Sequence, residues 1–304
     1  MKLMQLRHVV EVFRHGNHIS KTAEALHISQ PAISKHIQLL EEELGFAIFD
    51  RRRNRIVGVT DAGRELVAIA ERILGDIDNL KRLGAETANR DQGSITIATT
   101  HTQARYVLPR VIERFLKRFP TVRLRLRQGD PTRICEMVEA GEADLAIGSA
   151  TTRPFPGLVR YASHVLPRSI ITKAGHPLAR VRKPTLAQVA EYPLITYDPA
   201  YSGRWTLIDT FHKAGLEPNI VFGAVDADVS KTYVEMGLGI AVLATAAYDR
   251  LKDRGLVAKD ASHLFAPATV YVTLRAKAFL RRATYEFIQT FDPQLRREVI
   301  DAAL

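Results

Sequence analysis

The segment from Ser20 to Leu44 constrains the fold of this chain more than any other stretch. It predicts two helices joined by a tight turn, the first over about 21–26 and the second beginning after Ser29. Ser20 and Ser29 are suitable N-caps, and Pro31 falls in a first helical turn, where a missing N–H is tolerated. The apolar residues that recur every three or four positions in the second helix, predicting one buried stripe, are Ile33, Ile37, Leu40 and Leu44.

The opposite face of the second helix carries residues suited to reading DNA. Its side chains near the N-terminus are short or flexible hydrogen-bonding groups, which base-edge and phosphate contacts in a major groove require. The alternative is an ordinary helical hairpin with a solvated polar face. The candidate DNA-contacting residues of this segment are Ser29, Gln30, Pro31, Ser34, Lys35 and Gln38.

The flanking residues favour the DNA-binding interpretation. The apolar pattern of residues 3–13 predicts an amphipathic helix, and residues 46–49 and 56–59 predict the strands of a hairpin. An arginine run is usually a solvated loop, but beside a recognition helix it indicates a winged helix-turn-helix whose wing contacts phosphates. The candidate wing residues are Arg51, Arg52, Arg53 and Arg55.

Composition is consistent with a nucleic-acid partner and several domains. The chain has 304 residues, 46% of them hydrophobic, and a net charge of +10, with nine basic and six acidic residues among residues 1–60. The single cysteine, Cys135, lies in an apolar helical pattern and predicts a buried reduced thiol, with a sensor role as the alternative. Apolar runs stay short of the roughly 20 residues of a membrane span, so we expect a cytoplasmic protein with no membrane partner.

Residues 61–92 predict a long helix followed by a hinge. Thr60 is a suitable N-cap, the helical pattern continues to about Ala88, and residues 87–93 are polar and without periodicity. We expect this helix to form a homodimer, the alternative being that its seam packs on its own domain. The apolar residues of the heptad-like seam are Leu66, Ala70, Ile73, Ile77 and Leu80.

From residue 93 onward, short apolar runs alternate with amphipathic helices. This pattern predicts parallel sheets with helices on their faces, arranged as two lobes over about 93–162 with 267–304, and about 163–266. A strand at 269–274 and a helix at 281–291 would return to the first lobe. Such crossing connections place a ligand cleft between the lobes, at the carboxyl ends of the strands.

Polar side chains follow three of the predicted strands. Thr100, Thr102 and Gln103 follow the first strand, and Ser149 and Ser202 follow two later ones. Hydroxyls and backbone N–H groups at a helix N-terminus can bind a carboxylate, a sulfate or a phosphate. Any one of these residues could be a simple helix cap, but their convergence predicts a site for a small anion.

The sequence does not indicate catalysis. Its ten histidines are scattered, it has no cysteine pair for a metal, and it lacks a phosphate-binding loop, a nucleophile elbow and a dinucleotide fingerprint. His101, between Thr100 and Thr102, could serve as a base, but no third residue orients it. We therefore expect no enzyme activity, no catalytic residue, no metal site and no cofactor beyond a small-molecule effector.

The whole chain resembles a LysR-type transcriptional regulator, and from Ile97 onward it is similar to the CysB-like subgroup, the activators of cysteine regulons. The motifs that carry this resemblance are KTAE at 21–24, SQPAIS at 29–34, IATTHTQARYVLP at 97–109, QGDPTRI at 128–134 and DADVSKTYVEMGLGIAV at 226–242.

The resemblance implies an α+β and α/β multidomain fold: an N-terminal winged helix-turn-helix at 1–60, a linker helix and hinge at 61–92, and a two-lobed effector domain at 93–304 similar to periplasmic binding proteins. It implies a homotetramer on double-stranded promoter DNA that works with RNA polymerase and regulates sulfur assimilation. The implied effectors are O-acetylserine or N-acetylserine, sulfate, and adenylyl sulfate.

The subgroup's ligand-binding residues fall on Thr100, Thr102 and Gln103, with Ser149 and Ser202 in place of threonines. Leu166 stands where the cysteine regulators have an aromatic residue, and residues 150–156 also depart from the pattern. Both a cysteine regulator and a sister regulator for sulfate starvation or sulfonate use are consistent with this resemblance. A regulator of an unrelated pathway, or an architectural DNA binder without an effector, is the alternative.

Overall fold

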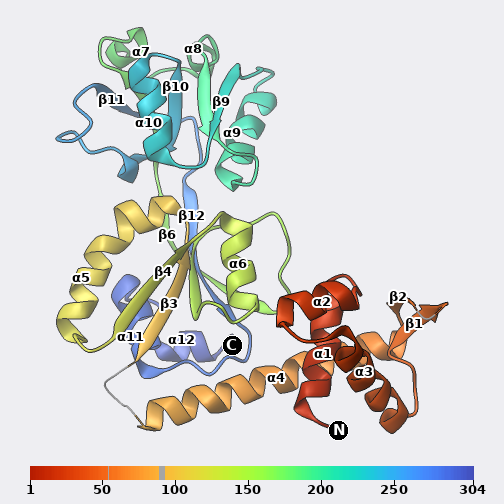
Figure 1. Ribbon diagram of the computed structural model, residues 1–304. Coiled ribbons are helices and arrows are strands. Elements are labelled where there is room, and N and C mark those ends of the chain that lie inside the picture. Colours follow the sequence, from red (N-terminus) through yellow and green to blue (C-terminus); the bar gives the residue numbers. More distant parts are fainter. Residues whose placement is uncertain (54, 89–92) are drawn as a thin grey trace. The chain divides into compact units, whose positions relative to one another are not determined.

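The computed structural model describes residues 1–53, 55–88 and 93–304, without the side chains of residues 78, 81–83, 85–88 and 202. The chain divides into two compact units, Met1–Ala88 and Asn89–Leu304 (Figure 1). Within the described residues, every helix is too short or too polar to cross a membrane.

The first unit is a winged helix-turn-helix, as the sequence predicts. Its elements are α1 (Leu3–Arg14), α2 (Ile19–Leu26), α3 (Gln30–Leu44), β1 (Phe49–Arg52), β2 (Arg55–Val59) and α4 (Asp61–Ala88). The strands β1 and β2 pair antiparallel as the wing. The predicted stripe of α3 is buried as expected, with Leu44 only partly covered. The residues of the core that α1, α3 and the start of α4 share include Leu6, Val9, Val10, Ile33, Ile37, Leu40, Leu66 and Ala70.

Two local expectations in this unit are wrong. Ser20 does not cap α2, because the chain is already helical from Ile19 and His18 occupies the N-cap position. Ser29 does occupy the N-cap of α3, but its side chain makes no capping hydrogen bond. The first wing strand starts at Phe49 rather than at residue 46, and the backbone N–H groups of Ile48 and Phe49 donate to Glu41 at 2.8 and 3.2 Å where the chain enters it.

The helix α4 begins as predicted but packs differently from the expected dimer seam. The Gly63 N–H donates to the Thr60 hydroxyl at 2.9 Å, which caps the helix. Leu66 and Ala70 are buried in the core of their own unit, because α1 packs against this part of α4. The expectation that these two residues face a partner is therefore wrong, whereas Leu80 is 66% exposed.

The second unit contains two five-stranded sheets, one in each lobe (Figure 1). Lobe I has the strand order β4-β3-β5-β12-β6, and the predicted return strand is β12, antiparallel to both of its neighbours. Its strands are β3 (Ser94–Thr99), β4 (Arg123–Gln128), β5 (Leu145–Ser149), β6 (Leu158–Leu166) and β12 (Ala268–Arg275). Its helices are the π-helix η1 (Gln103–Val107), α5 (Leu108–Arg118), α6 (Pro131–Glu139), α11 (Arg282–Phe291) and α12 (Arg297–Asp301).

Lobe II has the strand order β11-β7-β10-β8-β9, with β10, β8 and β9 parallel and β7 antiparallel to its neighbours. Its strands are β7 (Arg168–Lys173), β8 (Leu194–Tyr197), β9 (Ile220–Ala224), β10 (Ile240–Ala244) and β11 (Leu256–Asp260). Its helices are α7 (Pro177–Arg180), α8 (Leu186–Ala190), α9 (Ser202–Lys213), α10 (Ala227–Met236) and the short η2 (Thr245–Ala247).

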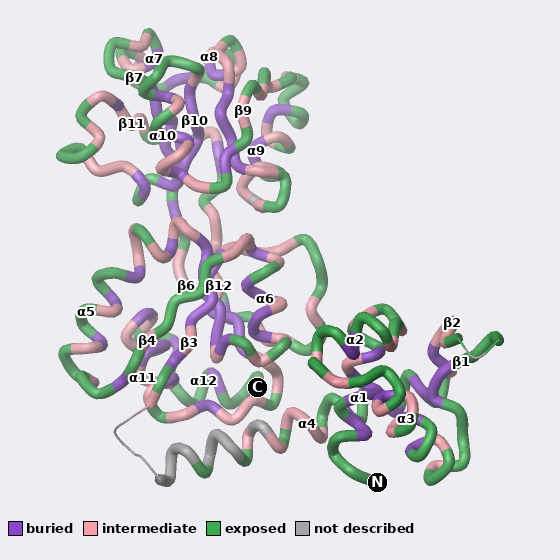
Figure 2. Tube along the Cα trace, in the orientation of Figure 1, coloured by how far each residue is buried: buried purple, intermediate pink, exposed green. Residues whose placement is uncertain are grey.

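Alternation of apolar residues along the strands gives each sheet two covered faces. In lobe II, Ile170 packs with the helix α9 residues Leu207 and Phe211, whereas the adjacent Ile171 packs with Val234 of α10. Figure 2 shows the resulting buried strands at the centre of the lobe. Cys135, on the buried face of α6, is buried as predicted, and burial raises the pKa of its thiol to about 11.

Several elements were not predicted. The strands β6 and β11 and the helices α7 and α12 are additional, and β6 extends lobe I to Leu166, beyond the expected boundary at 162. The helix expected from Arg105 is preceded by a π-helical turn that starts at Gln103. Residues 89–92 of the predicted hinge lie outside the described residues.

A pair of stacked histidines joins α1 to the recognition helix. His8 is 2% exposed, its ring centroid lies 4.7 Å from that of His36 on α3, and the two Nδ1 atoms are 2.9 Å apart. That contact needs one Nδ1 to donate and the other to accept, so a second proton would disrupt it. Burial, together with the charges of His36 and Arg7, lowers the pKa of His8.

The stability of the first unit should therefore depend on pH. The folded pKa of His8 lies below its unfolded value of about 6.5, so the unfolded chain binds the proton first as the pH falls. Stability is complete above that value and declines below it, with a slope of at most about 1.4 kcal/mol per pH unit. Calorimetric unfolding of the full chain between pH 7.5 and 5 measures this slope.

His8→Phe keeps a ring in place and should flatten the dependence, whereas the exposed His27, substituted as His27→Asn, serves as the control that leaves it intact. An unchanged slope in His8→Phe would assign the effect to other groups.

Candidate functional site

The outward face of α3 presents the predicted DNA-contacting residues. Gln30, Lys35 and Gln38 are exposed, and Ser34 is half-buried. The Gln30 Oε1 accepts a hydrogen bond from the Ser20 hydroxyl at 3.3 Å, and the Gln38 Nε2 donates to Glu42 at 2.9 Å. Both amides are therefore oriented by neighbours on the same unit, at the helix face opposite the buried stripe. The two remaining predicted residues, Ser29 and Pro31, are also exposed.

The wing arginines divide into two groups. Arg51 lies 2.9 Å from Glu41 of α3, and the same carboxylate accepts the backbone N–H groups at the start of β1. This arginine therefore also holds the wing to the recognition helix, and its contact with DNA phosphates stays a prediction. The exposed arginines near the tip are Arg52, Arg53 and Arg55, and residue 54 between them lies outside the described residues.

The predicted effector residues of lobe I face one cavity. Thr100, Thr102 and Gln103 follow β3, Ser149 ends β5, and all four line a cavity of about 50 Å³ between the two sheets. The backbone of Ser202 starts α9 next to Gly203, which lines the same cavity, and the Ser202 side chain lies outside the described residues. The convergence expected from the strand ends is thus observed for the four described side chains.

Local packing explains how these residues are placed. The buried Thr99 hydroxyl donates to the Ile147 carbonyl at 2.8 Å, which ties β3 to β5 directly before the cavity. Gly148 is required beside it, because a Cβ there would lie 2.5 Å from Ile134 and 3.1 Å from Thr100. Gln103, only 2% exposed, opens the π-helix η1, a wider helical turn that is frequent at functional sites.

Lobe II contributes a buried cation that the sequence interpretation missed. Arg168, the first residue of β7, is 7% exposed and lines the cavity with Tyr197, Tyr201 and Gly203. Burial lowers the pKa of the Arg168 guanidinium and raises the pKa of the Tyr197 hydroxyl. The signal in the sequence was an arginine placed directly before the apolar run at 169–172.

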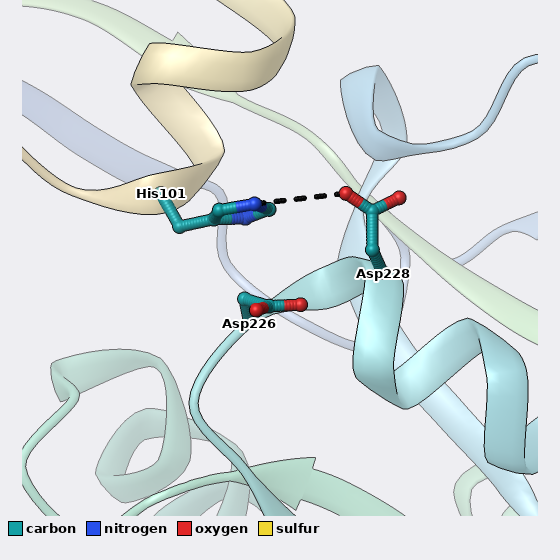
Figure 3. A group of neighbouring side chains, drawn as sticks. All are labelled: His101, Asp226 and Asp228. Atoms are coloured by element: carbon teal, nitrogen blue, oxygen red, sulfur yellow. Dashed lines mark ion pairs between the residues drawn. The ribbon is translucent and has the colours of Figure 1, made fainter. Parts of the chain in front are cut away.

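His101, Asp226 and Asp228 gather where the lobes meet (Figure 3). Their nitrogen and carboxylate oxygens lie within 4.8 Å of one another, which is close enough to hold a metal ion. The sequence interpretation expected no metal site, and these residues share no local spacing because His101 belongs to lobe I and the aspartates to lobe II.

The surroundings of Asp228 favour a different role for this cluster. Tyr106 donates to its carboxylate at 2.7 Å, Arg105 Nε lies 3.4 Å away and Lys231 Nζ 3.2 Å away. His101 Nε2 is at 3.6 Å. These cations already balance the carboxylate, and Asp226 accepts the Val229 N–H as the cap of α10. The cluster is therefore an ionic clasp between the lobes.

Comparisons with known proteins identify the family. The protein-family model for the LysR substrate binding domain matches residues 88–296. The family model for the bacterial regulatory helix-turn-helix protein, lysR family, matches residues 3–64. The HTH-type transcriptional regulator SsuR of Burkholderia cenocepacia is 44% identical, covering 100% of this chain and 99% of the relative. The regulator CysB of Haemophilus influenzae is 42% identical, with coverages of 100% and 94%.

The regulator cbl of Escherichia coli is 39% identical, covering 99% of this chain and 95% of the relative. The crystal structure of the cofactor-binding domain of the Cbl transcriptional regulator is 38% identical and matches 69% of this chain and 92% of that one, with a TM-score of 0.66. A full-length OxyR variant from Pseudomonas aeruginosa, at 21% identity and a TM-score of 0.66 over 96% of this chain and 94% of that one, shares the fold. The chain belongs to the LysR family of bacterial helix-turn-helix transcriptional regulators.

Proposed function

We propose that this LysR-type regulator controls sulfur assimilation genes in response to a small anion bound between the two lobes of its effector domain. The observation that carries the proposal is the convergence of Thr100, Thr102, Gln103 and Ser149 on one interlobe cavity. Full-length identities of 39–44% to the regulators SsuR, CysB and cbl support the pathway that the CysB-like motifs imply.

The cavity favours the smaller of the expected effectors. Its volume of about 50 Å³ accommodates only a few water-sized groups. Sulfate suits this space, an acetylated serine (O-acetylserine or N-acetylserine) requires a modest separation of the lobes, and adenylyl sulfate requires a much larger one. We therefore rank adenylyl sulfate last among the three.

The binding partners follow from the same proposal. Promoter DNA is held by α3 and the wing, and two chains associate through the exposed apolar residues of α4, which include Ile69 and Leu80. We propose a homotetramer in the cytoplasm that acts on RNA polymerase through binding alone, without catalysis. Ile69 replaces Leu66 and Ala70 as a dimer contact, because those two residues are buried in their own unit.

The effector would act by shifting the balance between lobe arrangements. A ligand held by both lobes favours the arrangement in which all of its contacts are made, and it can shift the equilibrium only by its difference in affinity for the two arrangements. Couplings of this kind are typically about 1–3 kcal/mol, or roughly 5-fold to 150-fold.

Thr102→Val should weaken the binding of the effector and leave the binding of promoter DNA unchanged. The substitution removes a hydroxyl that lines the cavity and keeps the side-chain shape, and a hydrogen bond to a charged group contributes about 1.5–3 kcal/mol, or roughly 10-fold to 150-fold in affinity. Calorimetric titration with N-acetylserine and with sulfate measures the loss, and fluorescence anisotropy measures promoter binding. Thr232→Val, an exposed threonine of α10, is the matched control. Equal affinities for Thr102→Val and the wild type would remove the cavity from the proposal.

Substitutions in the first unit should separate affinity from sequence preference. Arg52→Ala and Arg53→Ala remove exposed cations, so each should weaken binding to all DNA sequences and reduce the slope of log K against log salt by about 1. Gln30→Ala should instead relax the preference among sequences by about 1–3 kcal/mol at one base pair and leave the salt slope unchanged. Titrations of DNA at several salt concentrations measure both effects. A uniform loss for all three variants would mean that α3 does not read bases.

A further inference from the structure

We propose that the guanidinium of Arg168, on lobe II, binds the anionic group of the effector and selects for a charged ligand. Thr100, Thr102 and Gln103 bind the same group from lobe I. The inference rests on the proposed function, because it takes the interlobe cavity to be the effector site. It adds a specificity-determining residue on the other lobe, and it requires the effector to carry a full negative charge where it meets β7.

The first argument is the burial of Arg168 without an anion. The residue is 7% exposed, and its guanidinium lines the cavity. Among the side chains and backbone groups that the structure describes, no carboxylate lies within 4.0 Å of this guanidinium, and none accepts a hydrogen bond from it. A buried charge that lacks a partner is costly, and the cost disappears when an anion enters the site.

The second argument is the arrangement of the backbone around the guanidinium. A Cβ on Gly203 would lie 3.1 Å from Arg168 Nη2, so glycine at this position leaves room for the cation. Gly203 belongs to the first turn of α9, a 12-residue helix whose N-terminal N–H groups add a partial positive charge. A cation packed against a helix N-terminus is unfavourable in the empty cavity and favourable once an anion lies between them.

The third argument is that the nearby acids have other partners. Besides burial, the charges of Asp226 and Asp228 help to raise the pKa of Tyr197, the neighbour of Arg168, so these two acids are near enough to be considered as partners of Arg168. Asp226 caps α10, however, and Asp228 is held by Tyr106, Lys231 and the rest of the clasp. Both acids are therefore engaged, and we expect the anion that Arg168 lacks among the described residues to come from outside the chain.

The test compares a charged ligand with its neutral analogue. The full chain is titrated calorimetrically with N-acetyl-L-serine, with its carboxamide and with inorganic sulfate. Losing one partner of a desolvated charge pair lowers affinity by at least about 30-fold, so the wild type should bind the carboxylate at least that much more tightly than the carboxamide. In Arg168→Met this discrimination should fall below about threefold, and sulfate binding should be lost. Thr102→Val should weaken both serine ligands and keep the discrimination.

The melting temperature of the ligand-free chain gives a second readout. Arg168→Met removes an uncompensated buried charge and should leave the melting temperature equal or higher. The matched control is Arg281→Met, because Arg281 is a partly buried arginine paired with Asp144 at 3.3 Å, and its loss should lower the melting temperature.

The inference would be overturned if Arg168→Met lowered the melting temperature as much as Arg281→Met and still preferred the carboxylate to the carboxamide. Arg168 would then be a structural residue. If the wild type binds none of the three probes, the effectors of the proposed function are wrong, and a lowered melting temperature in Arg168→Met would then also refute the inference.

Discussion

The strand β12 pairs with both β5 and β6, and this pairing holds residues 268–275 in the sheet of lobe I after the chain has passed through lobe II. The chain therefore crosses between the sheets twice, and the carboxyl ends of β3 and β5 face the start of β7. Without β12, lobe II would be tethered at one end only. The two crossings keep Thr100 of one lobe and Arg168 of the other on the same cavity, which an effector has to match.

Polar burial where the sheets meet is an energetic cost to the effector domain. Thr100, Gln103 and Arg168 are each less than 9% exposed, and the Oε1 atom of Gln103 has no hydrogen-bond partner among the described residues. Such groups destabilise a fold unless something completes their interactions. A site that is incomplete when empty gains most from a ligand, which is how binding can change the balance between lobe arrangements.

The π-helix η1 connects the cavity to the clasp between the lobes. Gln103 begins this turn and lines the cavity, whereas Tyr106 of the same turn donates to Asp228 of lobe II. One helical turn thus carries both a cavity residue and the partner of Asp228. In the first unit, Glu41 has a comparable organising role, because one carboxylate binds Arg51 and the two backbone N–H groups that lead into the wing.

The sequence by itself determined the winged helix-turn-helix, most of the alternating strands and helices of the effector domain, and four of the cavity residues. These features depend on local patterns: the spacing of Ile33, Ile37 and Leu40 on one helix, and hydroxyl residues directly after apolar strands. Only the tertiary structure decided which face of α4 is free, since burial of Leu66 depends on α1 packing against it. The roles of Arg168 and Asp228 were decided in the same way, because burial and charge pairing depend on residues that are distant in the sequence.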